Sequence, residues 1–490
     1  MIKHVFIWLF IGGTLSAEAQ WPILTPSGVN YDIERKQDSI RDIKVHLLAW
    51  PLRIHDTASQ KHKFLIIPQG QLYSGLDYNS ALQGRNTAAG GFAATGSFGK
   101  FNWYADALGG FFGQSSYRDS LIYKRGVVPG IGRVLNNDIA PLAWQGNGYL
   151  HYNPGKIFIV EAGKGTHFLG EGHRSLLLSD VAASYPYLRL TTKVWNVQYE
   201  NLYTIQKHRR LDGTFRNKHT TSHWISWNIT KRLNVSIFET IVFQATDTLL
   251  NRGFDVNYLN PFIFYRPVEY YVGSPDNALM GLNTSYHFKV GAVLYSQFVI
   301  DEFYLKRLRN TPGWWANKWG FQVGAKFYEA FGIKGLFLQT EYNVARPFIY
   351  GHGSPVQNYA HEQQPLAHPL GANFREWVNR ATWHKDEWTL NYQFNLATKG
   401  TDTAEINFGG NIFKTYTNRY SENHNKIGQG VSNLLIYNDI SVCRWIKKDW
   451  FLQAHAGYTF YLRRDLFAHY PTHYVYVGIS SALRRQNRDY

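Results

Sequence analysis

The sequence is poor in sulfur and in charge. Its 490 residues include one Cys and two Met, and only 18% of them are Asp, Glu, Lys or Arg. One Cys can form neither an intramolecular disulfide nor a cluster of metal-bound thiolates, so a disulfide-stapled scaffold and a zinc finger are both excluded.

The sequence also lacks long apolar runs. After residue 19 it has no stretch of 18 consecutive apolar residues, which excludes a bundle of membrane-spanning helices. It is nevertheless 44% hydrophobic and 16% aromatic, which argues against disorder because such a chain has ample apolar surface to bury. No Pro- or Ser-rich linker, charge block or change of composition marks a domain boundary. One large closed architecture is therefore favoured over two or three domains.

Residues 1–19 are typical of a secretory signal peptide. A short basic start at Lys3 precedes an apolar run from Val5 to Leu15, and Ala17-Glu18-Ala19 is a small-x-small cleavage site. The formal net charge is +16. In an exported protein, that charge suits anionic lipid headgroups or acidic glycans better than nucleic acid, for which the sequence offers no basic cluster or recognisable module.

The next segment, residues 20–62, is charged and is predicted to lie in the periplasm. Ile33, Ile40 and Ile43 have near-helical spacing, which favours a short helix, but an irregular first strand fits equally well. Residues 63–490 are predicted to form the rest of the molecule as one domain.

Strict alternation of apolar and polar residues dominates this larger part. From Trp388 to Leu396 one face carries only Trp, Leu, Tyr and Phe, and the other only Thr, Asn and Gln. This period of two predicts a strand between an apolar and a wet environment. Five further segments show similar alternation: 195–200, 321–328, 336–344, 404–409 and 452–460.

The composition of the two faces favours a membrane barrel over a soluble sandwich. The polar faces carry Asn, Gln, Gly and single charges, as a crowded wet lumen would, and the apolar faces carry aromatics near strand ends, as interfacial girdles do. A closed barrel also removes the sheet edges that hydrocarbon does not tolerate. The 471 residues from Gln20 to Tyr490 allow roughly 16 to 20 spanning strands, the last at His473–Leu483. We therefore predict an all-β protein with a single transmembrane antiparallel β-barrel. The stretches 134–147, 209–221, 310–317, 351–371 and 415–430 are predicted to be loops.

Five segments resemble a known family in the same order along the chain. They are GKGTHFLGEGHRSLLLSDVAASYPYLRL (163–190), LNPFIFYRPVEYYVGSPDNALMGLN (259–283), YSQFVIDEF (295–303), LQTEYNVARPFIY (338–350) and NYAHEQQPLAHPLGANFREW (358–377). Together they resemble the Wzi-type capsule-assembly outer-membrane family, and most closely its RemB-like branch in gliding Bacteroidota. The resemblance implies a barrel of roughly 18 strands with periplasmic N-terminal helices, acting as a lectin that holds surface polysaccharide. For the RemB-like branch it implies an association with gliding motility. Residues 20–62 show no clear helical-bundle pattern, and in this they depart from the enterobacterial capsule proteins.

The glycine-rich run that begins this resemblance has two interpretations. Gly163, Gly165 and Gly170 surround cationic side chains, so backbone donors and cations could meet an acidic sugar. The same glycines equally suit an inward loop or bulge that plugs the pore. Sugar rings would stack on Tyr, with Arg recognising acidic groups. The predicted polysaccharide-binding residues are His167, Glu171, Arg174, Asp180, Tyr185, Tyr187, Glu341, Tyr359, His361 and His368.

Simpler interpretations apply to several acidic residues. Glu341 faces the predicted lumen, where a lone acid is more often the partner of a cation such as Lys326 than a general base. Asp276 follows Ser274-Pro275 and is more typical of a turn than of a ligand. The neighbours Asp301 and Glu302 end a predicted strand and would point to opposite faces, so they cannot form a catalytic pair.

Catalytic and metal-binding motifs are missing from the sequence. It has no GxSxG, HExxH or P-loop pattern. The pairs His361/His368 and His167/His173 are seven and six residues apart, and neither matches the spacing of a metal site. We expect no enzyme activity, no metal and no cofactor. A barrel-embedded lipase would need a Ser/His pair on the outer face, which the sequence does not position.

The resulting prediction is an outer-membrane barrel that binds or organises capsular or extracellular polysaccharide at the cell surface. Its expected partners are surface polysaccharide and outer-membrane lipid or lipopolysaccharide. An alternative is a docking barrel of the gliding-motility or protein-secretion machinery, with motility or secretion proteins as partners. A porin is the third interpretation, and it is less favoured because the Gly-rich and His-rich loops are expected to fold inward.

Overall fold

The computed structural model describes residues 63–79, 81–113, 115–136, 141–155, 157–210, 213–244, 255–261, 276–302, 311–447, 450–466, 468–481 and 489. The expected signal peptide and the predicted periplasmic segment 20–62 lie outside these described residues.

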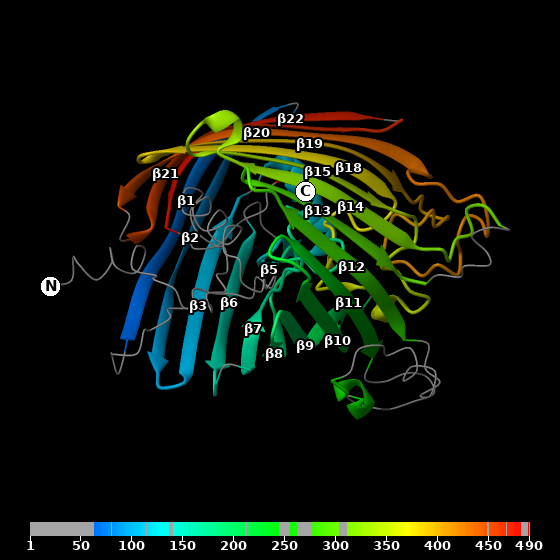
Figure 1. The fold of residues 1–490 in the computed structure, drawn as a ribbon. Helices are drawn as coiled ribbons and strands as arrows, with labels where there is room; N and C mark the ends of the chain where they lie inside the picture. The colour runs from blue at the N-terminus through cyan, green and yellow to red at the C-terminus, as the bar shows by residue number, and fades with distance from the viewer. Residues whose placement is uncertain are drawn as a thin grey trace.

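Eighteen antiparallel strands form one closed sheet (Figure 1). Each strand pairs with the next along the chain, and β1 pairs with β22, which closes the ring. The predicted all-β antiparallel barrel of roughly 18 strands is therefore confirmed. The strands are β1 (Lys63–Asn79), β2 (Ala81–Phe98), β3 (Phe101–Phe112), β6 (Leu142–Tyr152), β7 (Phe158–Gly165), β8 (Tyr185–Val194), β9 (Val197–Arg209), β10 (Phe215–Asn228), β11 (Leu233–Gln244), β12 (Asn277–His287), β13 (Ala292–Ile300), β14 (Trp319–Tyr328), β15 (Leu336–Ala345), β18 (Phe374–Lys385), β19 (Trp388–Thr401), β20 (Val431–Lys447), β21 (Leu452–Arg464) and β22 (His469–Ser480).

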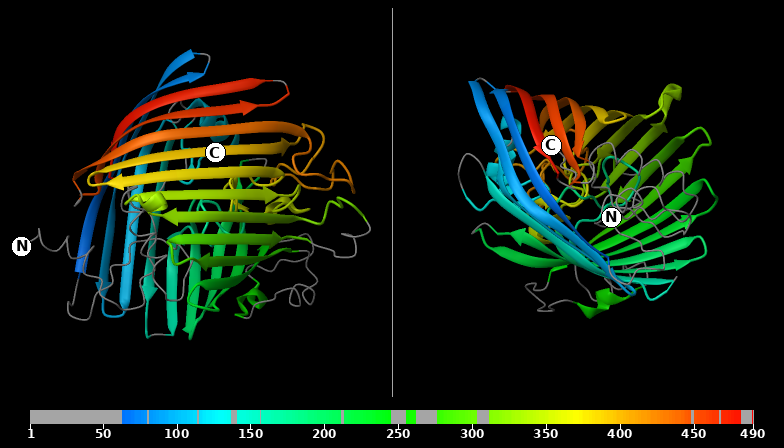
Figure 2. Two further views of the ribbon diagram at one scale, coloured as in Figure 1. Left: turned by 45° about the horizontal axis from the view of Figure 1, so that its top comes forward. Right: turned by 90° about the vertical axis from the view of Figure 1, so that its left-hand side faces the viewer.

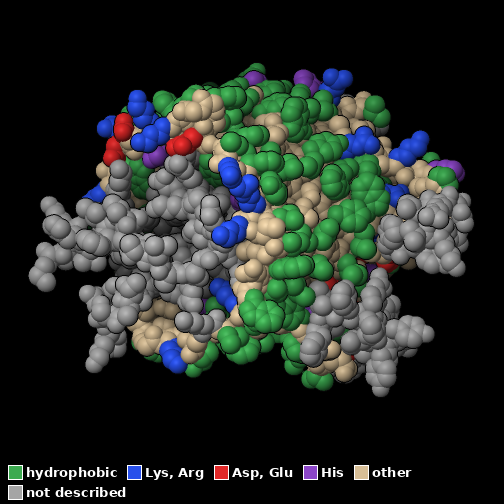
Figure 3. Space-filling model, viewed as in Figure 1, with side chains coloured by type: hydrophobic (Ala, Val, Ile, Leu, Met, Phe, Trp, Pro, Cys, Tyr) green, Lys and Arg blue, Asp and Glu red, His purple; other side chains and the backbone are tan. Residues whose placement is uncertain are grey.

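The two faces of the wall follow the alternation in the sequence. Trp388 and Leu390 of β19 are exposed on the outside, whereas Thr389 between them is buried. In β14, Phe321 is exposed and Gln322 is buried. Figure 3 shows the outcome as a broad hydrophobic surface over the strands β12 to β15. The outer face thus suits lipid and the inner face suits a wet, hydrogen-bonded lumen.

The connections at the two ends of the barrel differ in length. At one end the turns are short, and at the other most of the connections are long. Transmembrane barrels have short periplasmic turns and long extracellular loops, so we call the end with the long connections the extracellular end. The short turns include 99–100, 195–196, 229–232 and 386–387, and the long connections are 113–141, 166–184, 245–276, 301–318, 346–373 and 402–430.

Several expected boundaries differ from the structure. The alternating segment 404–409 is not a strand but part of the connection between β19 and β20. There the carboxylate of Asp402 accepts hydrogen bonds from the backbone N–H groups of Phe408 and Gly410, which folds the segment back on itself. The loops expected at 134–147 and 209–221 are partly strand, because β6 begins at Leu142 and β10 at Phe215.

Two long connections, 166–184 and 346–373, fold into the lumen, and we call them the plug loops. Ser179 N–H donates to the Leu366 carbonyl at 2.7 Å, and the Tyr350 hydroxyl donates to the Leu176 carbonyl at 2.8 Å, so the two loops are joined. Leu176 and Leu366 are fully buried in the main hydrophobic cluster. Figure 2 (right) looks into the barrel and shows connecting segments inside the ring of strands. Of the two interpretations of the glycine-rich run, the inward loop agrees with this arrangement.

The helix α3 (Ser116–Arg125) in the connection 113–141 is also attached to the inner wall. Asp119 forms an ion pair with Arg85 of β2 at 2.7 Å. The backbone N–H of Ser116 donates to Asp77 of β1. The helix is therefore fixed to the first two strands.

A short segment, Asp255–Pro261, lies on the outside of the wall, and we call it the strap. It contains the 3-10 helix η1 (Val256–Leu259). Tyr203 of β9 donates its hydroxyl to the Leu259 carbonyl at 3.1 Å, and Tyr258 packs in a small cluster with Ile241 and Phe243 of β11. The strap therefore adds a second, minor core outside the barrel.

Beneath the strap the outward face of the wall is polar. Thr221 and His223 share a face of β10 with Trp227, which is exposed, yet both are fully buried. Asn201 of β9 and Glu239 of β11, the neighbours of His223 in the register, are buried as well. Polar side chains of this kind would be costly against hydrocarbon, so the strap takes the place of lipid over this sector.

Candidate functional site

The plug loop 166–184 is anchored to the wall by Glu341 of β15. Its carboxylate accepts the backbone N–H groups of His173 at 2.7 Å and of Arg174 at 3.1 Å. It also accepts the hydroxyl of Tyr295 at 2.9 Å and the amide of Asn343 at 2.8 Å. Four donors thus surround one buried acid, which satisfies it without a cation.

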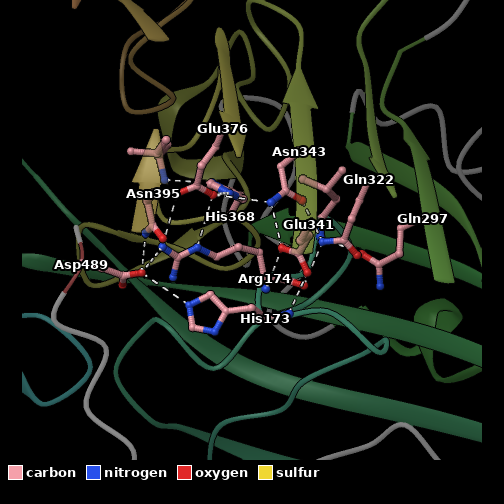
Figure 4. A network of polar contacts seen from close by, with 12 residues as sticks. His173, Arg174, Gln297, Gln322, Glu341, Asn343, His368, Glu376, Asn395 and Asp489 are labelled. Carbon is pink, nitrogen blue, oxygen red and sulfur yellow. Dashed lines mark hydrogen bonds and ion pairs between the residues drawn. The ribbon is translucent and has the colours of Figure 1, made fainter. Parts of the chain in front are cut away.

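Arg174 lies between two carboxylates in the lumen (Figure 4). Its Nη2 is 2.6 Å from Asp489 Oδ2 and 3.4 Å from Glu376 Oε1, and its Nε is 3.4 Å from Glu376 Oε2. Burial alone would lower the pKa of the guanidinium, but the two carboxylates raise it, so Arg174 is charged.

His368 supports Glu376 from the other plug loop. Its Nε2 is 2.7 Å from Glu376 Oε2, and its Nδ1 accepts the backbone N–H of Leu370 at 3.2 Å. These partners assign the proton to Nε2 of a neutral ring. Burial lowers the pKa of His368, outweighing the pull of Glu376, which agrees with that assignment. The ring stacks on Phe374 with centroids 4.2 Å apart.

Asp489, beyond the last strand, is held by four side chains that we call the carboxylate cradle. Its Oδ2 accepts from Arg174 Nη2, from Asn395 Nδ2 at 2.8 Å and from Gln393 Nε2, and it lies 3.4 Å from His173 Nε2. Burial by itself would raise the pKa of Asp489. The charge of Arg174 and the hydrogen bonds hold that pKa well below its usual range, so the carboxyl is ionised.

A second network surrounds Glu161 of β7. Its Oε1 accepts the Tyr187 hydroxyl at 2.9 Å and lies 2.8 Å from Arg189 Nη2. His167 meets the ring of Tyr187 edge-on, with centroids 4.4 Å apart, and its Nδ1 is 3.4 Å from the Tyr185 hydroxyl. Burial lowers the pKa of His167 to about 3. His167 is therefore neutral at ordinary pH and offers no positive charge to an acidic sugar.

The remaining predicted residues are mostly buried as well. Glu171 lies 3.6 Å from Lys326, so the lysine suggested as a partner of Glu341 pairs with a carboxylate of the plug loop. Tyr359 stacks with Tyr350, and His361 Nδ1 accepts the backbone N–H of Lys207 at 3.0 Å. Burial lowers the pKa of His361 to about 3. Asp180 alone among the ten predicted residues is partly exposed.

The structure thus divides the predicted residues into groups. Arg174, Glu341 and His368 meet in one network, and His167, Tyr185 and Tyr187 in another. The sequence reasoning missed Glu376 and Asp489, which carry the charges opposite Arg174. Gln393 and Asn395 were recognised only as the polar face of a strand, and no local pattern marks Asp489.

Asp276 joins the inside and the outside of the wall at the extracellular end of β12. Its Oδ2 accepts the hydroxyl of Tyr258 in the strap at 2.6 Å, and its Oδ1 accepts the amide of Gln357 in a plug loop at 2.8 Å. Asp276 therefore does more than the turn forming expected from the sequence, because its side chain links two segments of the chain. Asp301 and Glu302 were expected to point to opposite faces, but both carboxylates lie near Lys318 Nζ, at 3.9 and 3.3 Å.

Aromatic and cationic side chains gather in the long connections of the extracellular end. Trp315 and Tyr416 have ring centroids 4.6 Å apart, Arg419 lies 4.3 Å from the centroid of Trp315, and Lys318 Nζ lies 4.5 Å from that of Tyr416. Trp315, Tyr416 and Arg419 are partly exposed. We call these four residues the extracellular aromatic cluster.

Among the described residues, no group of three or more His, Cys, Asp or Glu side chains is placed to hold a metal ion. The helices of that part of the chain include none with the length and hydropathy to cross a membrane.

Comparison with solved structures shows what this fold is similar to. Wzi, described as a carbohydrate-binding β-barrel involved in group 1 capsule assembly in Escherichia coli, matches with a TM-score of 0.57 and 8% identity over 94% of this chain and 99% of that chain. OccK8 (OprE) of Pseudomonas aeruginosa matches with a TM-score of 0.47 and 10% identity over 85% of this chain and 98% of that one. OprD of the same organism matches with a TM-score of 0.44 and 11% identity over 85% of this chain and 95% of that one. The sequence matches no family model and no curated protein. The chain has the fold of an 18-stranded outer-membrane β-barrel.

Proposed function

We propose that this protein binds surface polysaccharide at the extracellular end of the barrel. The observation that carries the proposal is the extracellular aromatic cluster, in which the partly exposed rings of Trp315 and Tyr416 adjoin the partly exposed guanidinium of Arg419. Lys318 is fully buried and supports the ring of Tyr416 from below. Aromatic faces stack on sugar rings, and guanidinium groups bind carboxylates in bidentate fashion. The similarity to Wzi, which is described as carbohydrate-binding, supports the proposal.

The occupied lumen argues against the porin interpretation. A porin needs an open aqueous path along its lumen. Here the plug loops carry fully buried leucines, and Glu341, Glu376 and Gln297 of the wall hold the loop 166–184 through hydrogen bonds and an ion pair.

Polysaccharide retention on an affinity column would test the proposal. We expect Trp315→Ala or Tyr416→Ala to weaken binding of the native capsular or extracellular polysaccharide by about 3- to 10-fold, since each removes one stacking surface. Trp195→Ala is the matched control, because Trp195 is fully exposed in the short turn 195–196 at the other end of the barrel. Equal binding by all three variants and the unaltered protein would contradict the proposal.

The RemB-like, gliding-motility interpretation rests on the resemblance in sequence alone and stays a prediction. A comparison of unaltered and deletion cells by surface-glycan staining, with spreading on agar scored in the same cultures, separates the two functions. Loss of retained glycan supports polysaccharide binding. Intact glycan with lost spreading would instead make the barrel a component of motility.

A further inference from the structure

The outward faces of the strands carry charge of almost one sign. The acids of the described strands point into the lumen, except Glu239, which the strap covers. Cations, in contrast, recur on the lipid side of the wall. They are Lys164, Lys207, Arg209, Arg375, Lys385, Arg444 and Arg464. A wall of this kind is complementary to anionic lipid head groups.

Most of these cations lie at the extracellular end of their strands. Lys164 is one residue from the end of β7, and Lys207 is two residues from the end of β9. Arg375 is the second residue of β18, and Arg464 is the last residue of β21. Strand ends lie at the level where head groups meet a membrane barrel, so these side chains meet the head groups of the outer leaflet.

Lys164 and Lys207 form a pair, because only the strand β8 separates them. In the register, the neighbours of Lys164 are Gly148 of β6 and Pro186 of β8, which leave the space beside it open. Strands lie about 4.8 Å apart, so two lysines on β7 and β9 start roughly 10 Å apart, within the reach of both stems to one anion.

Two further contacts define this pair. Burial, and then the charges of Lys218, Lys207 and Lys164, lower the pKa of His361, so both lysines of the pair lie close to that one plug residue. The next outward cation, Arg209, donates to the Arg125 carbonyl at 3.3 Å and is therefore directed away from the pair.

The wall around the pair suits an amphiphile that contains a sugar. Towards the middle of the membrane, the same outward faces expose Val160 of β7, Leu188 of β8 and Ile205 of β9, which form an apolar strip for acyl chains. On the other side, the exposed indole of Trp144 lies 5.7 Å from Lys164 Nζ and offers an aromatic face to a sugar ring. A soluble polymer would leave the apolar strip unused.

We propose that Lys164 and Lys207 bind the phosphate of an acylated sugar in the outer leaflet, that is, a glycolipid of the lipid A type. The two ammonium groups pair with the phosphate, the acyl chains lie on the apolar strip, and Trp144 contacts the sugar. This site lies on the outer surface of the wall, and it does not depend on polysaccharide binding at the extracellular aromatic cluster.

Titration of lipid A into the full-length protein in a neutral detergent, followed by native mass spectrometry, tests the site. The probes are lipid A with its phosphates and the same lipid without them. We expect Lys164→Gln and Lys207→Gln each to weaken binding of the phosphorylated lipid by about 5-fold, and the double variant by about 20-fold. Binding of the phosphate-free lipid should not change. Lys164→Arg should bind like the unaltered protein, because it keeps the charge.

Arg375→Gln is the matched control, because Arg375 is also exposed at the extracellular end but its neighbours in the register are Val344 and Thr398. It should change the affinity by less than about 2-fold. An equal loss in Arg375→Gln and Lys164→Gln would show that the lipid senses only overall charge, and it would overturn the site. So would unaltered binding by the double variant. Displacement of the lipid by millimolar inorganic phosphate, or equally tight binding of phosphatidylglycerol, would overturn the assignment to a glycolipid.

Discussion

At the scale of single residues, the lumen stabilises charge with fixed hydrogen bonds. Glu341 is surrounded by two backbone N–H groups, a tyrosine and an asparagine, and Arg174 by two carboxylates. Removing one member of such a network leaves its partners buried and unsatisfied, which costs more than the net contribution of the bond. The interior is therefore sensitive to single polar substitutions.

The neutral histidines of the plug predict a dependence of stability on pH. Burial lowers the pKa of His167 and His361 to about 3 from a usual value of 6.5. Between pH 6.5 and pH 3 these histidines are protonated in the unfolded chain but not in the folded chain. Their contribution to the free energy of unfolding is therefore fully present above pH 6.5 and is lost progressively as the pH is lowered toward 3. Each histidine contributes a slope of about 1.4 kcal/mol per pH unit in that window.

Denaturant unfolding in detergent at pH 7 and pH 5 measures this loss. In His361→Gln, the loss of stability between pH 7 and pH 5 that is due to these two histidines should be about half as large as in the unaltered protein. His424→Gln is the control, because His424 is exposed in the connection 402–430. An identical slope in the unaltered protein and His361→Gln would show that His361 titrates normally when folded.

At the scale of elements, the strands were predictable and their connections were only partly so. Alternation identified the stretches that became β14, β15, β19 and β21, because a wall between lipid and water imposes a period of two on every strand. Alternation wrongly predicted a strand at 404–409, where the local hydrogen bonds of Asp402 determine the conformation instead. The strap gave no such signal, because it depends on tertiary contacts with Tyr203 and Phe243.

The candidate site was predictable in residue types but not in partners. Arg174, Glu341 and His368 were expected to be functional, yet each meets groups from elsewhere in the chain. Glu376 lies 202 positions from Arg174, and Asp489 lies 315 positions away. Contacts at such separations depend on closure of the barrel, and no spacing within one segment encodes them.

The strap should detach when Tyr258 is truncated. Its ring packs against Phe243 with centroids 4.6 Å apart, and its hydroxyl binds Asp276. Tyr258→Ala removes both contacts, at a cost of about 3 to 5 kcal/mol if the site is as well packed as a core. Tyr258→Phe loses only the hydrogen bond, about 1 kcal/mol.

Maleimide labelling of a cysteine beneath the strap reports that detachment. In a Cys443→Ser background, Thr221→Cys should be labelled only when combined with Tyr258→Ala, since Thr221 is fully buried. Trp227→Cys, on the same face of β10 outside the strap, should be labelled in both backgrounds. Labelling of Thr221→Cys with Tyr258 intact would show that the strap does not cover this sector.

At the scale of the whole molecule, the barrel is a closed wall around a filled interior. The plug loops, helix α3 and Asp489 enter the lumen from different parts of the chain and bind different strands. Eighteen strands enclose a lumen wide enough for an aqueous channel. The lumen is therefore blocked by these inserted segments and not by the narrowness of the barrel.

Conductance in planar bilayers tests that dependence. Deleting residues 170–178 from the plug should raise single-channel conductance by about 10-fold or more, because the deletion empties the centre of the lumen. Glu341→Ala, which loosens the same loop without shortening it, should give intermittent openings. Deleting residues 404–408, in the connection 402–430, is the control. A large, steady conductance in the unaltered protein would restore the porin interpretation.

Asp276 gives the rim of the barrel a mechanical property. One of its oxygens holds the strap on the membrane side of the wall and the other holds a plug loop on the lumenal side. A force on the extracellular loops near β12 would therefore act on both sides of the wall through this one side chain. Pulling on either the strap or the plug loop would therefore strain the same carboxylate, so the two segments are mechanically coupled at this point.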